Sequence, residues 1–150
     1  MNAFDRLAPH AHWLLRFSLA AVFLYHGLTK FPALGMLSDM MGMPTIMIGM
    51  LATMETAAGI LILFGGVGPA WATRTAGAII IVVMLGAIGM VHFPNGWNSV
   101  NMGMGNEGRG MEFQVTLLTI ALFFVIVGNA HQNVQAVPHR TETTRPAHNL

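Results

Sequence analysis

Glu55 is a carboxylate near the middle of an apolar run, Thr45 to Phe64, that carries no other charge. A charge at the centre of a bilayer costs at least about 2.5–3.5 kcal/mol on insertion scales, so such a residue marks a functional site or an obligatory ion pair by default. The residues that meet Glu55 therefore define the candidate site.

Ionisable residues lie near the ends of three other apolar segments. His26 and Lys30 stand at the carboxyl end of the first segment, His92 follows the third, and Glu112 precedes the fourth. Imidazole and carboxylate groups bond polar ligands and transfer protons at accessible pH. This set of residue types suits proton-coupled chemistry on a small ligand.

The elements that must position these residues are membrane-spanning helices. More than half of the residues (54%) are apolar and only 9% are charged, too apolar a composition for a soluble domain of 150 residues. Segments of spanning length cover Trp13–Leu28, Ile46–Phe64, Thr75–Val91 and Phe113–Gly128. No segment alternates like a barrel strand, so we predict an all-α fold, a bundle of four transmembrane helices over residues 1–128. The polar residues 129–150 are predicted to form a mobile cytoplasmic tail.

The arginines set the predicted orientation. They concentrate at the amino end, in the second connection and in the tail, which by the positive-inside rule places both termini in the cytoplasm of a bacterial inner membrane. The first connection (residues 31–45) and the third (92–111) then face outward. A net charge of +1 gives no indication of nucleic-acid binding, and the absence of cysteine excludes disulfides and thiolate chemistry within the chain.

This orientation places the polar groups in the outer half of one bundle. Glu55 lies about nine residues, or ~14 Å, below the outer end of its helix, and the other candidates lie near the outer ends of theirs. We therefore predict one outward-opening pocket that holds His26, Glu55, His92 and Glu112, with Lys30 at its rim. Glu55 and Glu112 are the candidate proton carriers. His26, Lys30, His92 and Trp97 are the candidate ligand contacts.

Two metal sites are alternative interpretations of the same chain. His26, Glu55, His92 and Glu112 are residue types that hold iron, zinc or manganese, and the two histidines alone suit haem. Methionines at three- and four-residue steps offer soft thioethers that select Cu(I); they are Met36, Met40, Met43, Met47, Met50 and Met54, with Met41 beside them and Met102, Met104 and Met111 in the other outer connection. Methionine is also an ordinary apolar gap-filler in helical bundles.

Simpler roles also account for single residues. Arg16 suits an interfacial arginine that extends to the headgroups, and Lys30 suits the same role on the outer side. The glycine-rich run of residues 103–110 resembles a dinucleotide loop only superficially, since no strand precedes it; we expect a flexible outer loop or lid.

The motifs resemble those of the DoxX family of small four-helix membrane proteins. They are RFSLAAVFLYHGLTKF in the first helix, METAAGILILFG in the second, AIGMVHFPNGW at the exit of the third, and Glu112-Phe113. The resemblance implies association with quinone-linked or thiol-linked redox systems. It favours a membrane subunit of a quinone-linked oxidoreductase that binds a quinone. Because the chain has no cysteine, we expect a partner to supply the electrons; the expected assemblies are a complex with a partner redox protein or a homo-oligomer. A metal or haem protein and a non-catalytic scaffold are the alternatives.

Overall fold

The computed structural model describes residues 3–100 and 107–130, and every regular element in these two ranges is helical. The four long helices are α2 (His12–Lys30), α4 (Thr45–Phe64), α5 (Ala70–Ala87) and α6 (Glu112–Val127). Short elements connect or extend them: α1 (Ala3–Leu7), η1 (Ala8–His10), η2 (Phe31–Ala33), α3 (Leu34–Met41), the π-helical η3 (Ile88–His92) and η4 (Phe93–Asn95). The all-α prediction is confirmed.

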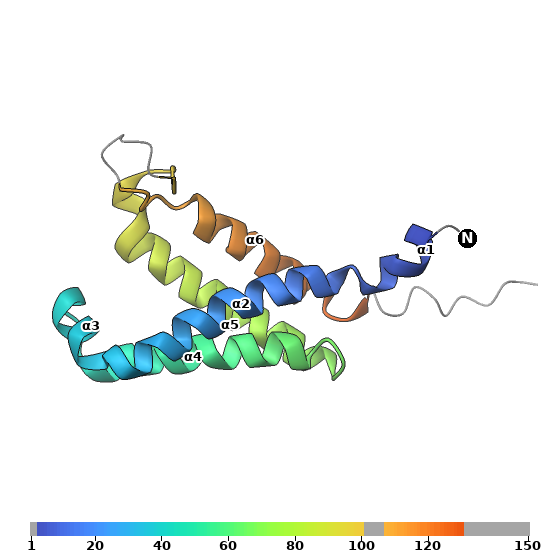
Figure 1. The fold of residues 1–150 in the computed structure, drawn as a ribbon, viewed down its shortest axis with the longest axis horizontal. Helices are drawn as coiled ribbons and strands as arrows, with labels where there is room; N and C mark the ends of the chain where they lie inside the picture. Colours follow the sequence, from blue (N-terminus) through green and yellow to red (C-terminus); the bar gives the residue numbers. More distant parts are fainter. Residues whose placement is uncertain (1–2, 101–106, 131–150) are drawn as a thin grey trace, which may run out of the picture.

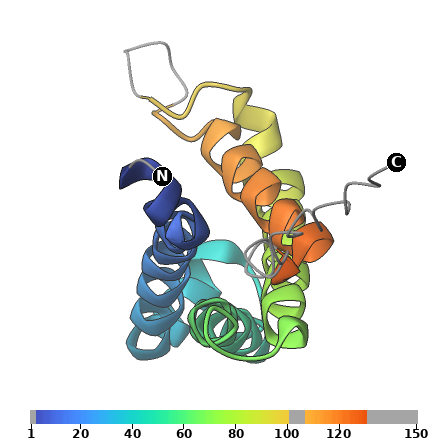
Figure 2. The ribbon, with the colours of Figure 1, turned by 90° about the vertical axis from the view of Figure 1, so that its right-hand side faces the viewer.

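The long helices form an open V (Figure 1). One arm consists of α2 packed along α4, and the other of α5 packed along α6; the two arms join through the contact of α4 with α5. Contacts between α2 and α6 are few, and Figure 2 shows these helices on opposite sides of the molecule with α4 and α5 between them. The bundle is therefore a curved row of four helices rather than a closed square.

Prolines and glycines determine where the helices end. Gly42 takes a left-handed conformation (φ 63°) after α3, and Pro44 directly precedes α4. Pro69 precedes α5 in the same way, at a position where its missing N–H costs nothing. Pro44 therefore separates the methionines of α3 from those of α4.

Small residues allow each arm to pack closely. A Cβ at Gly27 of α2 would collide with the backbone of Thr56 in α4, and one at Gly77 of α5 would collide with the Ala121 carbonyl in α6. Gly86, by contrast, has open space beside it. Gly86 therefore borders a cavity rather than a close helix contact.

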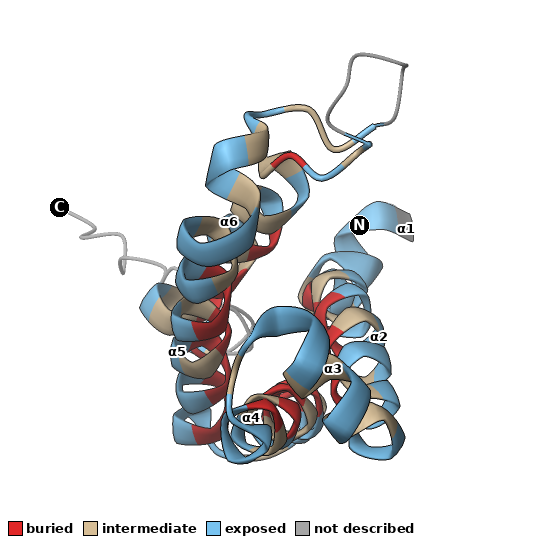
Figure 3. Ribbon diagram, turned by 90° about the vertical axis from the view of Figure 1, so that its left-hand side faces the viewer, coloured by how far each residue is buried: buried red, intermediate tan, exposed pale blue. Residues whose placement is uncertain are grey.

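The molecule has the character of a membrane protein. Helical stretches over Phe4–Met41, Thr45–Phe64 and Ala70–Asn95 are long and apolar enough to span a bilayer, and α6 is an apolar helix of 16 residues. Buried positions follow the seams between the helices, and exposed positions cover the faces turned away from the seams (Figure 3). Many of the exposed residues are large and apolar. A large exposed apolar surface is unfavourable in water, so these faces are suited to contact with lipid.

Candidate functional site

The closed end of the V is held by a polar cluster around Arg16. This side chain is fully buried, and its guanidinium lies 4.6 Å from the centre of the Phe124 ring in α6. Its Nη1 donates to the Ile62 carbonyl (2.6 Å) and to the Thr73 hydroxyl (3.0 Å), which belong to α4 and α5. Arg16 thus contacts all three other long helices. The interpretation of Arg16 as an interfacial arginine that extends to the headgroups is therefore wrong.

Asn129 completes this cluster from the residues that follow α6. Its Oδ1 accepts hydrogen bonds from Arg16 Nη2 (3.0 Å) and from the Thr73 hydroxyl (2.8 Å). Its Nδ2 donates to the carbonyls of Gly65 and Gly68 in the turn between α4 and α5. We call Arg16, Thr73 and Asn129 the polar clasp. The sequence assigns Asn129 to the tail. In the structure, the Asn129 side chain instead ties the end of α6 to the rest of the fold.

The open end of the V contains a cavity of about 440 Å³. Residues of α2 and α6 line its two sides, and residues of α4, α5 and η3 line the wall between them. Seven methionines contribute to the lining: Met41, Met43, Met47, Met50, Met54, Met84 and Met90. The cavity is thus mainly apolar and flexible, with polar groups at two places.

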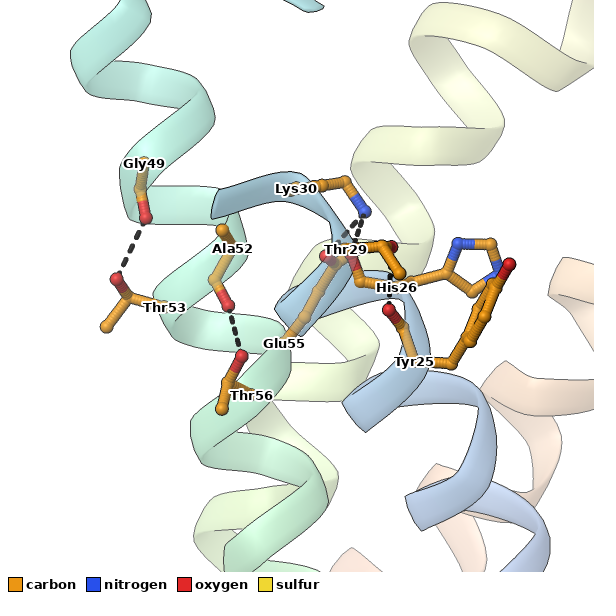
Figure 4. Close-up of polar contacts among 9 residues, drawn as sticks. All are labelled: Tyr25, His26, Thr29, Lys30, Gly49, Ala52, Thr53, Glu55 and Thr56. Carbon is orange, nitrogen blue, oxygen red and sulfur yellow. Dashed lines mark hydrogen bonds and ion pairs between the residues drawn. The ribbon is translucent and has the colours of Figure 1, made fainter. Parts of the chain in front are cut away.

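The first polar place is an ion pair between the two helices of one arm. Lys30 Nζ lies 2.6 Å from Glu55 Oε2 and also donates to the His26 carbonyl at 2.9 Å (Figure 4). Glu55 is only 6% exposed, and the Lys30 side chain is 18% exposed. The ammonium therefore compensates the charge of the deep carboxylate, and both residues border the cavity.

The second polar place lies on the other arm. The chain leaves α5 through the π-helical turn η3, which ends at His92. His92 Nδ1 lies 2.8 Å from the Arg109 carbonyl and must donate to it, so in the neutral ring Nε2 accepts from the Gln114 amide at 3.0 Å. Within the described residues, the buried Gln114 Oε1 has no hydrogen-bond partner. His92 and Gln114 both line the cavity.

The structure brings some of the predicted site residues together and separates others. His26, Lys30, Glu55 and His92 border the cavity, whereas Glu112 and Trp97 line a separate, shallower hollow with Ser99, Val100, Phe113 and Thr116. The imidazole of His26 is exposed and lies against the Tyr25 ring, away from Glu55 in Figure 4. The single pocket that the sequence predicts for four residues therefore contains three of them, without Glu112.

Helical geometry explains why Gln114 replaces Glu112 in the cavity. The two residues are two positions apart on α6, so their side chains leave the helix about 200° apart. Thr116 and Thr119 are exposed and bond the backbone of their own helix, so the polar stripe of Glu112, Thr116 and Thr119 turns away from the cavity. In the sequence, Gln114 is distinguished only by its position on the face of the helix opposite to that stripe.

The metal interpretation gains no support from the described residues. No three His, Asp or Glu side chains in these ranges come close enough to hold a metal ion, which argues against His26, Glu55, His92 and Glu112 as one ligand set. The methionines of α4 do share the cavity, but Met36 and Met40 of α3 do not line it. Met102, Met104, most of the glycine-rich loop and the tail beyond residue 130 lie outside the described residues.

Comparison with known families matches residues 11–93 to DoxX. The chain belongs to the DoxX family. The match covers α2, α3, α4, α5 and η3, and so includes the Lys30–Glu55 pair and His92. No curated protein and no solved structure matched the chain. The expected DoxX membership is confirmed.

Proposed function

We propose that this DoxX protein is a membrane subunit of a redox system that binds a quinone in the cavity between the arms of the V. One observation carries the proposal: an apolar cavity with a hydrogen-bonding group on each arm. A para-quinone offers groups of the corresponding kinds, a flat apolar ring with an oxygen at each end. Ligand sites of this size are usually apolar with a few polar groups that orient the ligand.

The Lys30–Glu55 pair supplies the first contact. An ammonium has three N–H donors, and Lys30 uses one on Glu55 and one on the His26 carbonyl. The third N–H is available for a quinone carbonyl oxygen. When that oxygen gains electrons it becomes basic, and Lys30 is positioned to donate a proton, with the Glu55 carboxylate stabilising the ammonium beforehand.

Gln114, whose amide is held by His92, supplies the second contact. The unpartnered Gln114 Oε1 is an acceptor, which suits the hydroxyl of a reduced quinone. A buried polar atom without a partner is costly, so a ligand that donates to it gains more than an ordinary hydrogen bond. The two contacts together would favour the reduced form once protons have been taken up.

Electrons must come from a partner. Reduction of a quinone to a quinol takes two electrons and two protons, and this chain has no cysteine to relay electrons as thiols or to hold an iron–sulfur cluster. A partner redox protein would supply them, directly or through a bound haem or metal as the alternative cofactor. The outward-facing side of a bacterial inner membrane is the proposed location of the cavity.

Binding of a short-tailed benzoquinone to the detergent-purified protein tests the proposal. We expect saturable binding that weakens about tenfold or more in Lys30→Met, the scale of one lost hydrogen bond to a charged group. Glu107→Gln is the matched control, because it breaks the exposed Glu107–Arg109 ion pair outside the cavity and should bind normally. Absence of saturable binding, with a visible haem spectrum or a metal found by elemental analysis, would favour the alternative cofactors.

A non-catalytic scaffold is the remaining alternative. If the chain only supports a partner oxidoreductase, that partner should remain fully active with folded Glu55→Gln protein. The quinone proposal expects the activity to fall instead, since the variant keeps the size of the side chain but removes its charge.

A further inference from the structure

The cavity lies between α2 and α6, which make few contacts with each other. The polar clasp joins α2 to the end of α6 at the closed end of the V, and the two helices then diverge toward the end that holds Lys30 and His92 (Figure 1). Val22 and Phe23 of α2 line the cavity on one side, and Phe113 and Leu117 of α6 line it on the other. The two helices stand apart in Figure 2, with α3 visible in the space between them.

We infer that the ligand of this cavity is a long-chain amphiphile that enters sideways from the bilayer between α2 and α6 and lays its apolar tail along the methionines of α4 and α5. This inference rests on the proposed function for the polar head of the ligand. It adds the chemical class of the rest of the ligand, an isoprenoid or alkyl chain, and its route of entry.

The methionines carry the first part of the argument. Met50 is 58% exposed and Met90 is 64% exposed, and both border the cavity. A methionine that only fills a gap in a helix bundle is buried, which these two are not. Unbranched, flexible thioether side chains instead form surfaces that adapt to apolar ligands of variable conformation. A chain with many rotatable bonds is such a ligand.

The ion pair carries the second part. Lys30 and Glu55 lie in the same wall as the methionines, so plain hydrocarbon in this cavity would cover charged groups without bonding them. An amphiphile avoids this cost, because its polar head forms hydrogen bonds with the ion pair while its tail covers the thioethers. Since α2 belongs to a stretch with the length and polarity of a membrane span and α6 is an apolar helix, the space between them faces the phase in which such a ligand dissolves.

Photocross-linking of the full-length protein in lipid vesicles tests the inference. The probe is a benzoquinone with a diazirine at the end of a ten-carbon tail, and the sites are mapped by mass spectrometry. We expect tail cross-links on residues 43–54 and 84–90, and their loss when an excess of unlabelled long-tailed quinone competes. Met50→Gln should also lose the cross-links near that position, whereas the control Met40→Gln, on α3 and outside the cavity lining, should keep them.

The alternative outcomes are distinguishable. Cross-links confined to outward-facing peptides, such as those that hold Leu14 or Ile60, with normal binding of the short-tailed quinone, would overturn the tail and entry inference and leave the proposed function standing. If added Cu(I) or Ag(I) abolished the expected cross-links and unlabelled quinone did not, the methionine wall would be a soft-metal site. Cross-linked dimers joined across the V would show that a second copy of the chain occupies it. Absence of any quinone binding would overturn both proposals.

Discussion

Lys30 Nζ and Glu55 Oε2 lie 2.6 Å apart and join the last turn of α2 to the middle of α4. Lysines at the ends of membrane helices commonly extend outward to the headgroups. Lys30 instead turns toward the deep carboxylate, so the cost of burying Glu55 is offset by a partner on the neighbouring helix. The pair therefore serves both the packing of this arm and the polarity of the cavity.

Removal of Lys30 alone should destabilise the protein more than removal of both charges. Lys30→Met leaves Glu55 unpaired, and breaking a buried pair from one side costs about 3–5 kcal/mol in fully buried cases; the partial exposure of Lys30 places this variant at or below that range. Lys30→Met with Glu55→Gln should recover much of the loss. Thermal unfolding in detergent measures this, and a double variant no more stable than Lys30→Met would contradict the pairing.

The polar clasp should be essential to the closed end of the V. Asn129→Ala removes the acceptor for Arg16 Nη2 and the donor for the Gly65 and Gly68 carbonyls. Each buried polar group left unpaired costs about 1–3 kcal/mol. We expect a clearly lower melting temperature in detergent. Thr119→Ala is the control, since Thr119 of α6 is exposed and bonds only the backbone of its own helix; equal losses in the two variants would contradict the assigned role.

Two glycine substitutions should separate packing from helix propensity. Gly27→Ala introduces a Cβ against the Thr56 backbone and should force α2 away from α4, which lowers stability and weakens the Lys30–Glu55 pair. Gly86→Ala meets no atom within 4 Å and should be neutral or stabilise by up to about 1 kcal/mol, as alanine does in a helix. Equal melting temperatures for the two variants would disprove the close contact at Gly27.

Membrane orientation is tested by single cysteines in this cysteine-free chain. The distribution of arginines predicts that cysteines at Asn98 and Thr141 react from opposite sides of the membrane, with Asn98 accessible from outside. An impermeant thiol reagent applied to intact cells measures this. Reaction at Thr141 but not Asn98 would place the cavity in the cytoplasmic half.

Sequence periodicity and composition predicted the helices well because apolar spans leave few alternatives in a membrane. The predicted segment Ile46–Phe64, for example, differs from α4 by one residue at its start. The importance of Glu55 also followed from the sequence, since an unpaired carboxylate at that depth in a span is costly. Its partner did not, because both His26 and Lys30 stand near the end of the same helix and only the packing of α2 on α4 selects Lys30.

The remaining parts of the site depend on tertiary structure. Arg16 lies in the second turn of its helix, where sequence alone suggests a headgroup contact, and only the meeting of four chain segments gives it acceptors. Gln114 lines the cavity where the sequence predicts Glu112, because the packing of α6 on α5 sets the rotation of α6 about its axis. The open V could not be foreseen, since each helix alone would suit a closed bundle equally well.

The most direct test of the central claim is the infrared spectrum of a quinone labelled with ¹³C at one carbonyl and bound to the detergent-purified protein. A hydrogen bond from Lys30 weakens the C=O bond, so we predict that the carbonyl band of bound quinone shifts to lower frequency than in detergent alone. In Lys30→Met the bound band should return to the free frequency, and in the Glu107→Gln control it should stay shifted. An unshifted band in the native protein, or an equal shift in Lys30→Met, would contradict a quinone held by the Lys30–Glu55 pair.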